Sequence, residues 1–363
     1  MWRHFDFLLL SATFALIGFG VAMIYSATYG VEPGARIDPR VVRQVVYALM
    51  GIVAMALLIG LDYRALANLA SVLWLGAVGA LVLVLALGRL AHGAQRWIDL
   101  GFFQLQPSEP AKLLVIVAVA RYLSTRRDRI HHFRTVLVSL GLALVPFLLT
   151  LGEPDLGTAL VFLAIWLGMA FAAGMRWRHI GALTAAGVAV LPLAWNLVPG
   201  YMRARVLIFM DPYSKPLDDG YNIIQAQISV GSGGWLGRGF LSGTQSQLHF
   251  LRVQYADFIF SVLAEELGFV GAMLLFTLFA LVIARALRAA YLASEPFGRL
   301  LAVGVASMLM FQLFVNVGMN VSLLPVAGIP LPFISFGGSS LISFMAAIGM
   351  VESITMRHRR FEF

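Results

Sequence analysis

Long apolar stretches separated by polar connections dominate the chain. A helix needs about 20 apolar residues to cross a bilayer. Such spans lie near residues 6–28, 41–61, 66–88, 110–124, 135–152, 157–174, 179–199, 258–284, 300–323 and 336–356. The pattern predicts an all-α polytopic integral membrane protein with about ten transmembrane helices, the fourth unusually short, in a single domain over residues 1–363.

The connection between the seventh and eighth spans, residues 200–257, is much longer than most others. Its aromatic and aliphatic residues indicate ordered structure, and long loops are often functional. Within it, residues 221–228 place apolar side chains at helical spacing. This spacing predicts an amphipathic helix that either lies at the membrane surface or packs against its own domain.

Composition agrees with a membrane protein, since 60% of residues are hydrophobic and 12% are charged, against about a quarter charged in soluble domains. The absence of cysteine excludes disulfides, thiolate metal sites and a cysteine nucleophile. The first apolar stretch is longer than a signal-peptide core and has no convincing cleavage site, so we expect it to remain as a helix.

The distribution of charge orients the chain. With the N-terminus inside, the inner segments hold 15 of the 26 Lys and Arg residues but only 6 of the 18 Asp and Glu residues. The positive-inside rule then places both termini in the cytoplasm. Anionic lipid headgroups suffice as partners for the Arg-rich inner loops, so no nucleic acid is implied.

In this orientation five polar segments fall outside, and we expect them to converge on one membrane face: 93–99, 106–112, 153–157, 200–257 and 316–340. Glu109 and Lys112 stand out because charge within a membrane segment usually marks function. They are three residues apart, so they share a helix face and can pair. A structural ion pair between helices is the alternative.

Asp257 is the main candidate for acid–base chemistry because it ends the long loop and begins the eighth span. Burial at this boundary would raise its pKa, as a general base requires. The alternative is a helix cap, a common role for aspartate. Glu265 and Glu266 lie deeper, and we expect them to pair with neighbours.

Five arginines lie on the same face, where guanidinium groups suit diphosphate oxygens, headgroups or local ion pairs: Arg96, Arg203, Arg205, Arg238 and Arg252. Asp155 follows Pro154 and is expected to cap the sixth span. Asn316 lies within the ninth span and is expected to make interhelical hydrogen bonds.

No nucleotide or transition-metal site is evident. The glycine-rich segment 231–239 lacks the Gly-Lys-Ser/Thr of a phosphate-binding loop, so we interpret it as turns. The seven histidines are scattered. No cofactor is required, although a divalent cation such as Mg²⁺ or Mn²⁺, held by carboxylate and diphosphate oxygens, is compatible with the residues.

Short motifs in consistent order resemble the SEDS family (shape, elongation, division and sporulation). They are IYSAT at 24–28, RQ at 43–44, DYR at 62–64, GAQRWI at 93–98, QPSE at 106–109, PDLGT at 154–158, YNIIQ at 221–225, GTQS at 243–246, DFIF at 257–260, AEELG at 264–268 and PLPFISFGGSS at 330–340. Residues 316–319 and 324–326 resemble the elongation branch more than the division branch.

The resemblance implies a peptidoglycan glycosyltransferase of the bacterial inner (plasma) membrane that polymerises lipid II into β-1,4 glycan for cell-wall elongation and rod shape. It also implies a class B penicillin-binding protein and the elongation machinery as partners. In one inverting displacement, Asp257 would deprotonate the acceptor 4-hydroxyl, and polyprenyl diphosphate would leave. The expected substrate-binding residues are Arg96, Glu109, Lys112, Asp155, Arg203, Arg205, Gln245 and Asn316.

One segment departs from the family pattern. The family usually has Phe-Leu-Pro-Glu-x-His-Thr-Asp-Phe, whereas residues 250–258 read FLRVQYADF. The aspartate is retained as Asp257, so its role carries over, but roles for the neighbouring glutamate and histidine do not.

Two functions of other classes compete with the polymerase. In a lipid II flippase, Glu109 and Lys112 would line a translocation path, but a flippase needs polar groups accessible from both faces, and the distinctive motifs lie on one. In a noncatalytic scaffold for a penicillin-binding protein, Asp257 would be a helix cap and the long loop a docking surface.

Overall fold

A computed structural model describes residues 4–29, 37–87, 89–91, 94–99, 101, 104–197, 200–216, 220–248, 250–251 and 253–357. Every predicted span coincides with a helix: α1 (Phe7–Thr28), α2 (Pro39–Gly60), α3 (Tyr63–Leu87), α4 (Ser108–Thr125), α5 (Phe133–Gly152), α6 (Leu156–Ala172), α7 (Trp177–Leu197), α11 (Ile259–Leu292), α12 (Pro296–Asn320) and α13 (Gly338–Met356).

Within the described residues, seven helices are long and apolar enough to cross a membrane: α1, α2, α3, α5, α11, α12 and α13. The apolar helix α6 is shorter, at 17 residues, and α4 carries Glu109 and Lys112 in its first turns. The predicted all-α polytopic membrane fold is confirmed.

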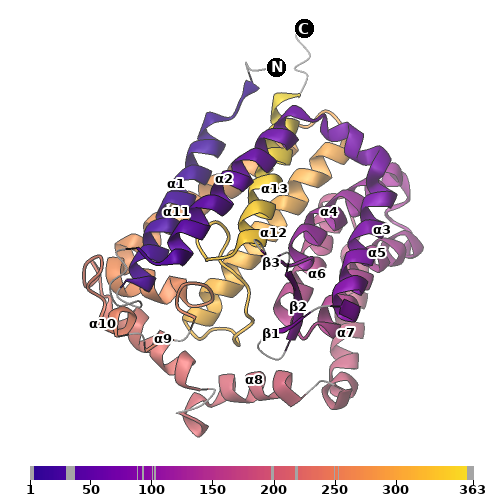
Figure 1. The fold of residues 1–363 in the computed structure, drawn as a ribbon. Coiled ribbons are helices and arrows are strands. Elements are labelled where there is room, and N and C mark those ends of the chain that lie inside the picture. The colour runs from indigo at the N-terminus through magenta and orange to yellow at the C-terminus, as the bar shows by residue number, and fades with distance from the viewer. Residues whose placement is uncertain are drawn as a thin grey trace.

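Helix α13 forms the centre of the bundle and is almost entirely buried. It packs along α2 and also contacts α12, α11 and α4 (Figure 1). Glycine permits the close approach to α2, because a Cβ at Gly349 would lie 2.6 Å from the Met55 carbonyl oxygen. Helix α2, in contrast, buries few residues, and its exposed apolar side chains suit contact with lipid.

The long connection contains α8 (Gly200–Met210), the 3₁₀ turn η3 (Pro212–Ser214), α9 (Tyr221–Ser232) and the single turn α10 (Thr244–Gln247). Helix α9 confirms the expected amphipathic helix. It packs against α11 and buries Ile223, Ala226 and Ser229, so it packs against its own domain. Figure 1 shows these elements at the end of the bundle opposite the start of α1 and the end of α13.

A small antiparallel sheet between α3 and α4 was not predicted. Its strands are β1 (Arg89–Ala91), β2 (Ala94–Asp99) and β3 (Gln104–Leu105), with β2 in the middle. Ala91 pairs with Ala94, and Ile98 pairs with Leu105. Strands of two to six residues are too short to give a clear alternating pattern in the sequence.

Two adjacent carboxylates hold the end of the long connection against α11. Glu265 accepts hydrogen bonds from the backbone N–H groups of Gln245 and Ser246, at 2.8 and 3.1 Å. Glu266 accepts one from the Ser26 hydroxyl at 2.6 Å and one from the Ser246 hydroxyl at 3.2 Å. The expectation that both glutamates pair with neighbours is confirmed.

In the glycine-rich segment 231–239, residues 231–232 end α9 and the rest forms turns, as expected. These turns complete a break in α11. At Gly268 the backbone has φ +62°, which interrupts the helical hydrogen bonds. The N–H groups of Arg238 and Gly239 donate to the freed carbonyls of Glu265 and Glu266, while Phe269 N–H donates to the Gly234 carbonyl. The turns therefore satisfy backbone groups that the break would leave unpaired.

We predict that Gly268→Ala lowers the thermal midpoint of the purified protein in detergent. The backbone of Gly268, at φ +62° and ψ −158°, is a conformation that essentially only glycine adopts, and it costs other residues about 1–3 kcal/mol. The added Cβ would also lie 2.8 Å from the Trp235 carbonyl oxygen. Gly141→Ala is the control, because Gly141 is helical with open space around it, and alanine favours a helix by about 1 kcal/mol. Equal midpoints for the two variants would contradict this account of the break.

Candidate active site at one end of the bundle

Asp257 lies immediately before α11 but does not cap it. The N-cap residue is Phe258, and no side chain caps the helix. The helix-cap alternative for Asp257 is therefore wrong. Its half-buried carboxylate is available for another role.

Two buried asparagines of α12 fix the backbone of Asp257. The Asn316 and Asn320 side-chain amides donate to its carbonyl oxygen at 3.3 and 3.0 Å. Asn316 also donates to the Ile329 carbonyl at 2.8 Å, and the Asn320 side-chain oxygen accepts from the Ser261 hydroxyl at 2.6 Å. Asn316 therefore bonds to backbone carbonyls of connecting segments and not to another helix, which differs from the interhelical hydrogen bonding expected for it. Because this side chain is fully buried, its role at the site is to position Asp257.

The segment that departs from the family pattern is held by its main chain and by the buried Gln254 side chain, which donates to the Ala27 and Ser246 carbonyls at 2.6 and 3.1 Å. The carbonyl oxygen of Tyr255 accepts from the Phe336 N–H at 2.9 Å, and that of Ala256 accepts from the Ser335 hydroxyl at 2.7 Å. Carbonyl contacts do not depend on the side chains that this sequence replaces. Arg252 lies outside the described residues.

Charged groups from three separate elements surround the Asp257 carboxylate: Arg205 of α8, Arg96 of β2 and Asp155 before α6. Burial raises the pKa of Asp257 to about 6, with Asp155 also raising it and both arginines lowering it. A carboxylate with this pKa is mostly ionised at neutral pH yet is more basic than an exposed aspartate. Those are the properties of a general base.

Arg96 connects the small sheet to the turn between α5 and α6. Its guanidinium donates to the Glu153 carbonyl at 2.9 Å and to the Pro154 carbonyl, and it lies 3.6 Å from the Asp155 carboxylate. Asp155 also accepts from the Thr158 N–H at 3.1 Å, which confirms it as the cap of α6. The structure thus brings two predicted site residues together.

Glu153 belongs to this cluster but was not among the predicted site residues. It is fully buried, and both carboxylate oxygens have no hydrogen-bond partner among the described residues. Burial, with a smaller contribution from Asp155, raises its pKa to about 8, although Arg96 opposes the shift. Glu153 is therefore mainly protonated at neutral pH. Its position in the polar 153–157 segment was the available sequence signal.

The other predicted site residues of the long connection lie in two different regions, with Arg203 and Arg205 on α8 and Gln245 on α10. Arg205 donates to the Val326 carbonyl at 3.3 Å, which links α8 to the connection between α12 and α13. Arg203 lies on the same short helix and is also half-buried. Gln245, in contrast, donates its backbone N–H to the Glu265 carboxylate at 2.8 Å, and Glu265 is not among the charged groups that act on Asp257.

Glu109 and Lys112 form the predicted ion pair. The Lys112 Nζ lies 2.8 Å from each Glu109 carboxylate oxygen, and both side chains are at most 1% exposed. The ammonium also lies 5.4 Å from the centre of the Phe344 ring on α13. The pair joins α4 to the bundle core and has no exposed surface for substrate in this arrangement.

Hydrogen bonds confirm that the polar segments converge on one face. The Ser339 hydroxyl accepts from the Gln106 N–H and donates to the Gln104 carbonyl, and Arg96, Arg205 and Asp257 make the contacts described above. Among the described residues, no three His, Cys, Asp or Glu side chains gather closely enough to hold a metal ion. A cation here would need additional oxygen ligands from a substrate.

The fold and site define a polytopic membrane protein with an ionisable aspartate, flanked by arginines, at one end of its helix bundle. The family model for cell cycle proteins of the FtsW, RodA and SpoVE group matches residues 7–360. The chain belongs to this family, which confirms the predicted resemblance.

Several relatives match over nearly the whole chain. The peptidoglycan glycosyltransferase MrdB of Escherichia coli K12 is 41% identical over 353 residues, covering 97% of this chain and 93% of the relative. The probable peptidoglycan glycosyltransferase FtsW of Geobacter sulfurreducens DL-1 / KN400 is 40% identical over 362 residues, covering 98% and 96%.

Solved structures agree. One chain, from a study of how a peptidoglycan synthase complex coordinates polymerization and crosslinking, has a TM-score of 0.83 at 34% identity and covers 98% of this chain and 99% of its own. The rod shape determining protein RodA of Thermus thermophilus has a TM-score of 0.73 at 32% identity, with 99% coverage of both chains.

We predict that Glu153→Gln flattens the dependence of stability on pH. The pKa of Glu153 is about 8 in the folded protein, against 4.5 for an ordinary glutamate. The contribution of protonated Glu153 to the free energy of unfolding is therefore fully present below pH 4.5 and is lost as the pH rises towards 8. The total loss is at most about 5 kcal/mol. Thermal midpoints from pH 5 to 9 test this, with Glu295→Gln as the control; an unchanged slope in Glu153→Gln would refute it.

We predict that removing one partner of the buried Glu109–Lys112 ion pair destabilises the protein more than removing both charges. Glu109→Gln leaves the Lys112 ammonium buried without its counterion, at a cost of about 3–5 kcal/mol. The double variant Glu109→Gln/Lys112→Met removes both charges and should recover most of the thermal midpoint. A single variant as stable as the wild type would show that the pair does not support the fold.

Proposed function

We propose that this chain polymerises lipid II as a peptidoglycan glycosyltransferase, with Asp257 as its general base. The observation that carries this proposal is the position of the Asp257 carboxylate, held by its backbone at the converging polar face, with a pKa near 6 and two arginines close by. Relatives named as peptidoglycan glycosyltransferases support the reaction class.

The reaction follows from the chemistry of the substrates. Asp257 takes the proton of the acceptor 4-hydroxyl as that oxygen attacks the anomeric carbon of the donor. The bond between this carbon and the diphosphate oxygen breaks, and polyprenyl diphosphate leaves with the electron pair. A single displacement inverts the anomeric centre and gives the β-1,4 link. The donor is already activated, so no nucleotide is needed.

The arginines near Asp257 suit the charge that develops on the leaving diphosphate. Arg205 and Arg203 on α8 are half-buried at this face, and Arg96 is held beside Asp155. We assign Arg203 and Arg205 to the diphosphate because they lie on the same short helix, half-buried at this face, and Arg205 is among the charged groups that act on Asp257. Lys112 is buried in an ion pair with Glu109 on α4, so its role is structural and it does not contact the diphosphate.

The chain is an integral membrane protein, and the proposed setting is the bacterial inner membrane. The arginine-rich segments predict that the ends of α1 and α13 face the cytoplasm and that Asp257 faces outwards. Figure 1 supports this orientation, since α1 starts and α13 ends at one end of the bundle and α8 to α10 lie at the other. In the proposed orientation the site faces the side on which an exported glycan is built.

The proposed partner is a class B penicillin-binding protein that crosslinks the new glycan within the elongation machinery. The structural relative from a peptidoglycan synthase complex supports a partner of this kind. A divalent cation such as Mg²⁺ or Mn²⁺ would supply charge to the diphosphate when bound. Asp257 and Asp155 are the nearby carboxylates able to contribute oxygen ligands.

We predict that Asp257→Asn reduces glycan synthesis from labelled lipid II by at least about 100-fold, the lower range for loss of a general base. The assay uses the purified protein with its cognate class B partner. Asp211→Asn is the matched control, because Asp211 is an exposed cap of η3 and asparagine caps equally well.

Both variants must fold and bind the partner as the wild type does. Equal glycan synthesis by wild type and Asp257→Asn would remove Asp257 from the mechanism. If the wild type itself makes no glycan, the polymerase proposal fails, and the flippase and scaffold alternatives gain support.

A further inference from the structure

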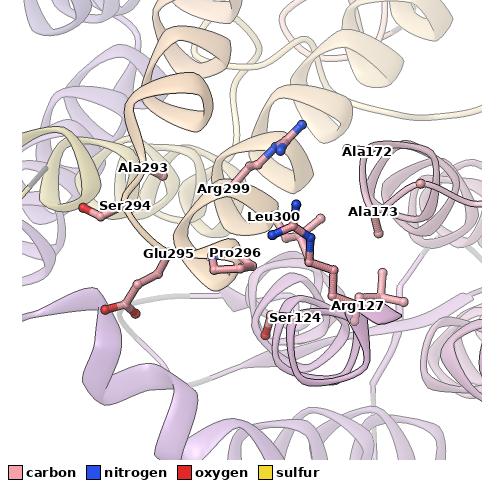
Figure 2. A pocket seen from close by; sticks show the side chains of 12 residues that line it. Ser124, Arg127, Ala172, Ala173, Ala293, Ser294, Glu295, Pro296, Arg299 and Leu300 are labelled. Atoms are coloured by element: carbon pink, nitrogen blue, oxygen red, sulfur yellow. The ribbon is translucent and has the colours of Figure 1, made fainter. Parts of the chain in front are cut away.

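A cavity of about 360 Å³ opens at the end of the bundle opposite Asp257 (Figure 2). It is enclosed by the ends of α4 and α6, the connection between α11 and α12, and the first turn of α12. Helix α12 runs from this cavity to the asparagines that hold Asp257, a length of about 37 Å for 25 residues. The cavity is therefore separate from the candidate active site.

Two arginines line the cavity without a counterion. Arg127 and Arg299 form no ion pair among the described residues. The nearby Glu295 carboxylate is bound to Arg64 at 2.9 Å. Figure 2 shows Glu295 pointing away from both guanidinium groups, which extend on the same side of the cavity. Two unneutralised guanidinium groups attract an anion, and their planar forks suit phosphate oxygens.

The start of α12 adds to this positive potential. Pro296 begins the helix, and no side chain caps its first N–H groups, so the N-terminal end of the helix dipole faces the cavity region. Apolar side chains complete the lining, among them Leu123, Ala172 and Leu300. The cavity thus offers charge for a phosphate and apolar surface for what is attached to it.

We propose that this cavity binds the phosphate of an anionic phospholipid headgroup. Its basic rim lies at the end of the bundle assigned to the cytoplasmic side, where arginines between helices meet anionic lipids. A volume above 300 Å³ is large enough for a small ligand. Free phosphate shares the same recognition chemistry, and the experiment distinguishes it from lipid.

Native mass spectrometry of the delipidated full chain in detergent tests the proposal. The probes are phosphatidylglycerol, the zwitterionic phosphatidylcholine and inorganic phosphate. We expect phosphatidylglycerol to bind more tightly than phosphatidylcholine, and Arg127→Gln/Arg299→Gln to weaken phosphatidylglycerol binding by roughly 10- to 30-fold. Arg127→Lys/Arg299→Lys keeps the charge and should retain most of the binding.

The matched control is Arg129→Gln/Arg288→Gln, which removes two exposed arginines that do not line the cavity. Binding retained in this control and lost in the cavity variant supports a specific site. Equal loss in both, or no loss in either, overturns it. Binding of inorganic phosphate without any preference for phosphatidylglycerol would overturn the lipid assignment.

Discussion

The hydrogen bonds from Asn316 and Asn320 to the Asp257 carbonyl are the interaction on which the site depends. In an apolar bundle, backbone groups outside a helix need partners within the protein, because lipid supplies none. The turn before α11 contains such a group, the Asp257 carbonyl, and the side-chain amides of α12 donate hydrogen bonds to it. Because both amides belong to buried side chains of α12, they fix the backbone of Asp257 to the helix bundle.

The same requirement explains how the rest of the polar face is assembled. The break at Gly268 is completed by the turns around Trp235, and Glu265 and Glu266 bind the end of the long connection. Arg96 satisfies two carbonyls in the turn between α5 and α6. Each contact satisfies polar groups inside the bundle, and the contacts of Arg96 hold one of the charges that act on Asp257. Substrate charge would then meet groups already oriented towards it.

The sequence predicts the parts of this structure that depend on local pattern. Apolar spans give the helices, helical spacing gives α9, and a separation of three residues gives the Glu109–Lys112 pair. The strands of the small sheet are too short to give a clear alternating pattern. The Arg96–Asp155 contact joins segments far apart in the chain, so no local pattern reveals it. The burial of Glu153 also could not be predicted from the sequence. A glutamate in a polar connecting segment is normally exposed and ionised, and only the folded structure shows that this one is buried.

The resemblance to a known family supplied the role of Asp257, and the structure supplies a physical reason for it. The segment before Asp257 differs from the family pattern, yet it is held by the Tyr255 and Ala256 carbonyls and by the Gln254 side chain. Asp257 is therefore retained although the residues just before it differ from the family pattern. Whether it acts as a base depends on its ionisation in the working enzyme.

The most direct measurement is the pH dependence of lipid II polymerisation in Arg205→Gln and Asp155→Asn. Asparagine preserves the helix cap at 155. Since Arg205 lowers the pKa of Asp257 and Asp155 raises it, the acidic limb, near pH 6 in the wild type, should move up in Arg205→Gln and down in Asp155→Asn. An acidic limb that stays fixed in both variants, or moves the same way in both, would contradict Asp257 as the general base.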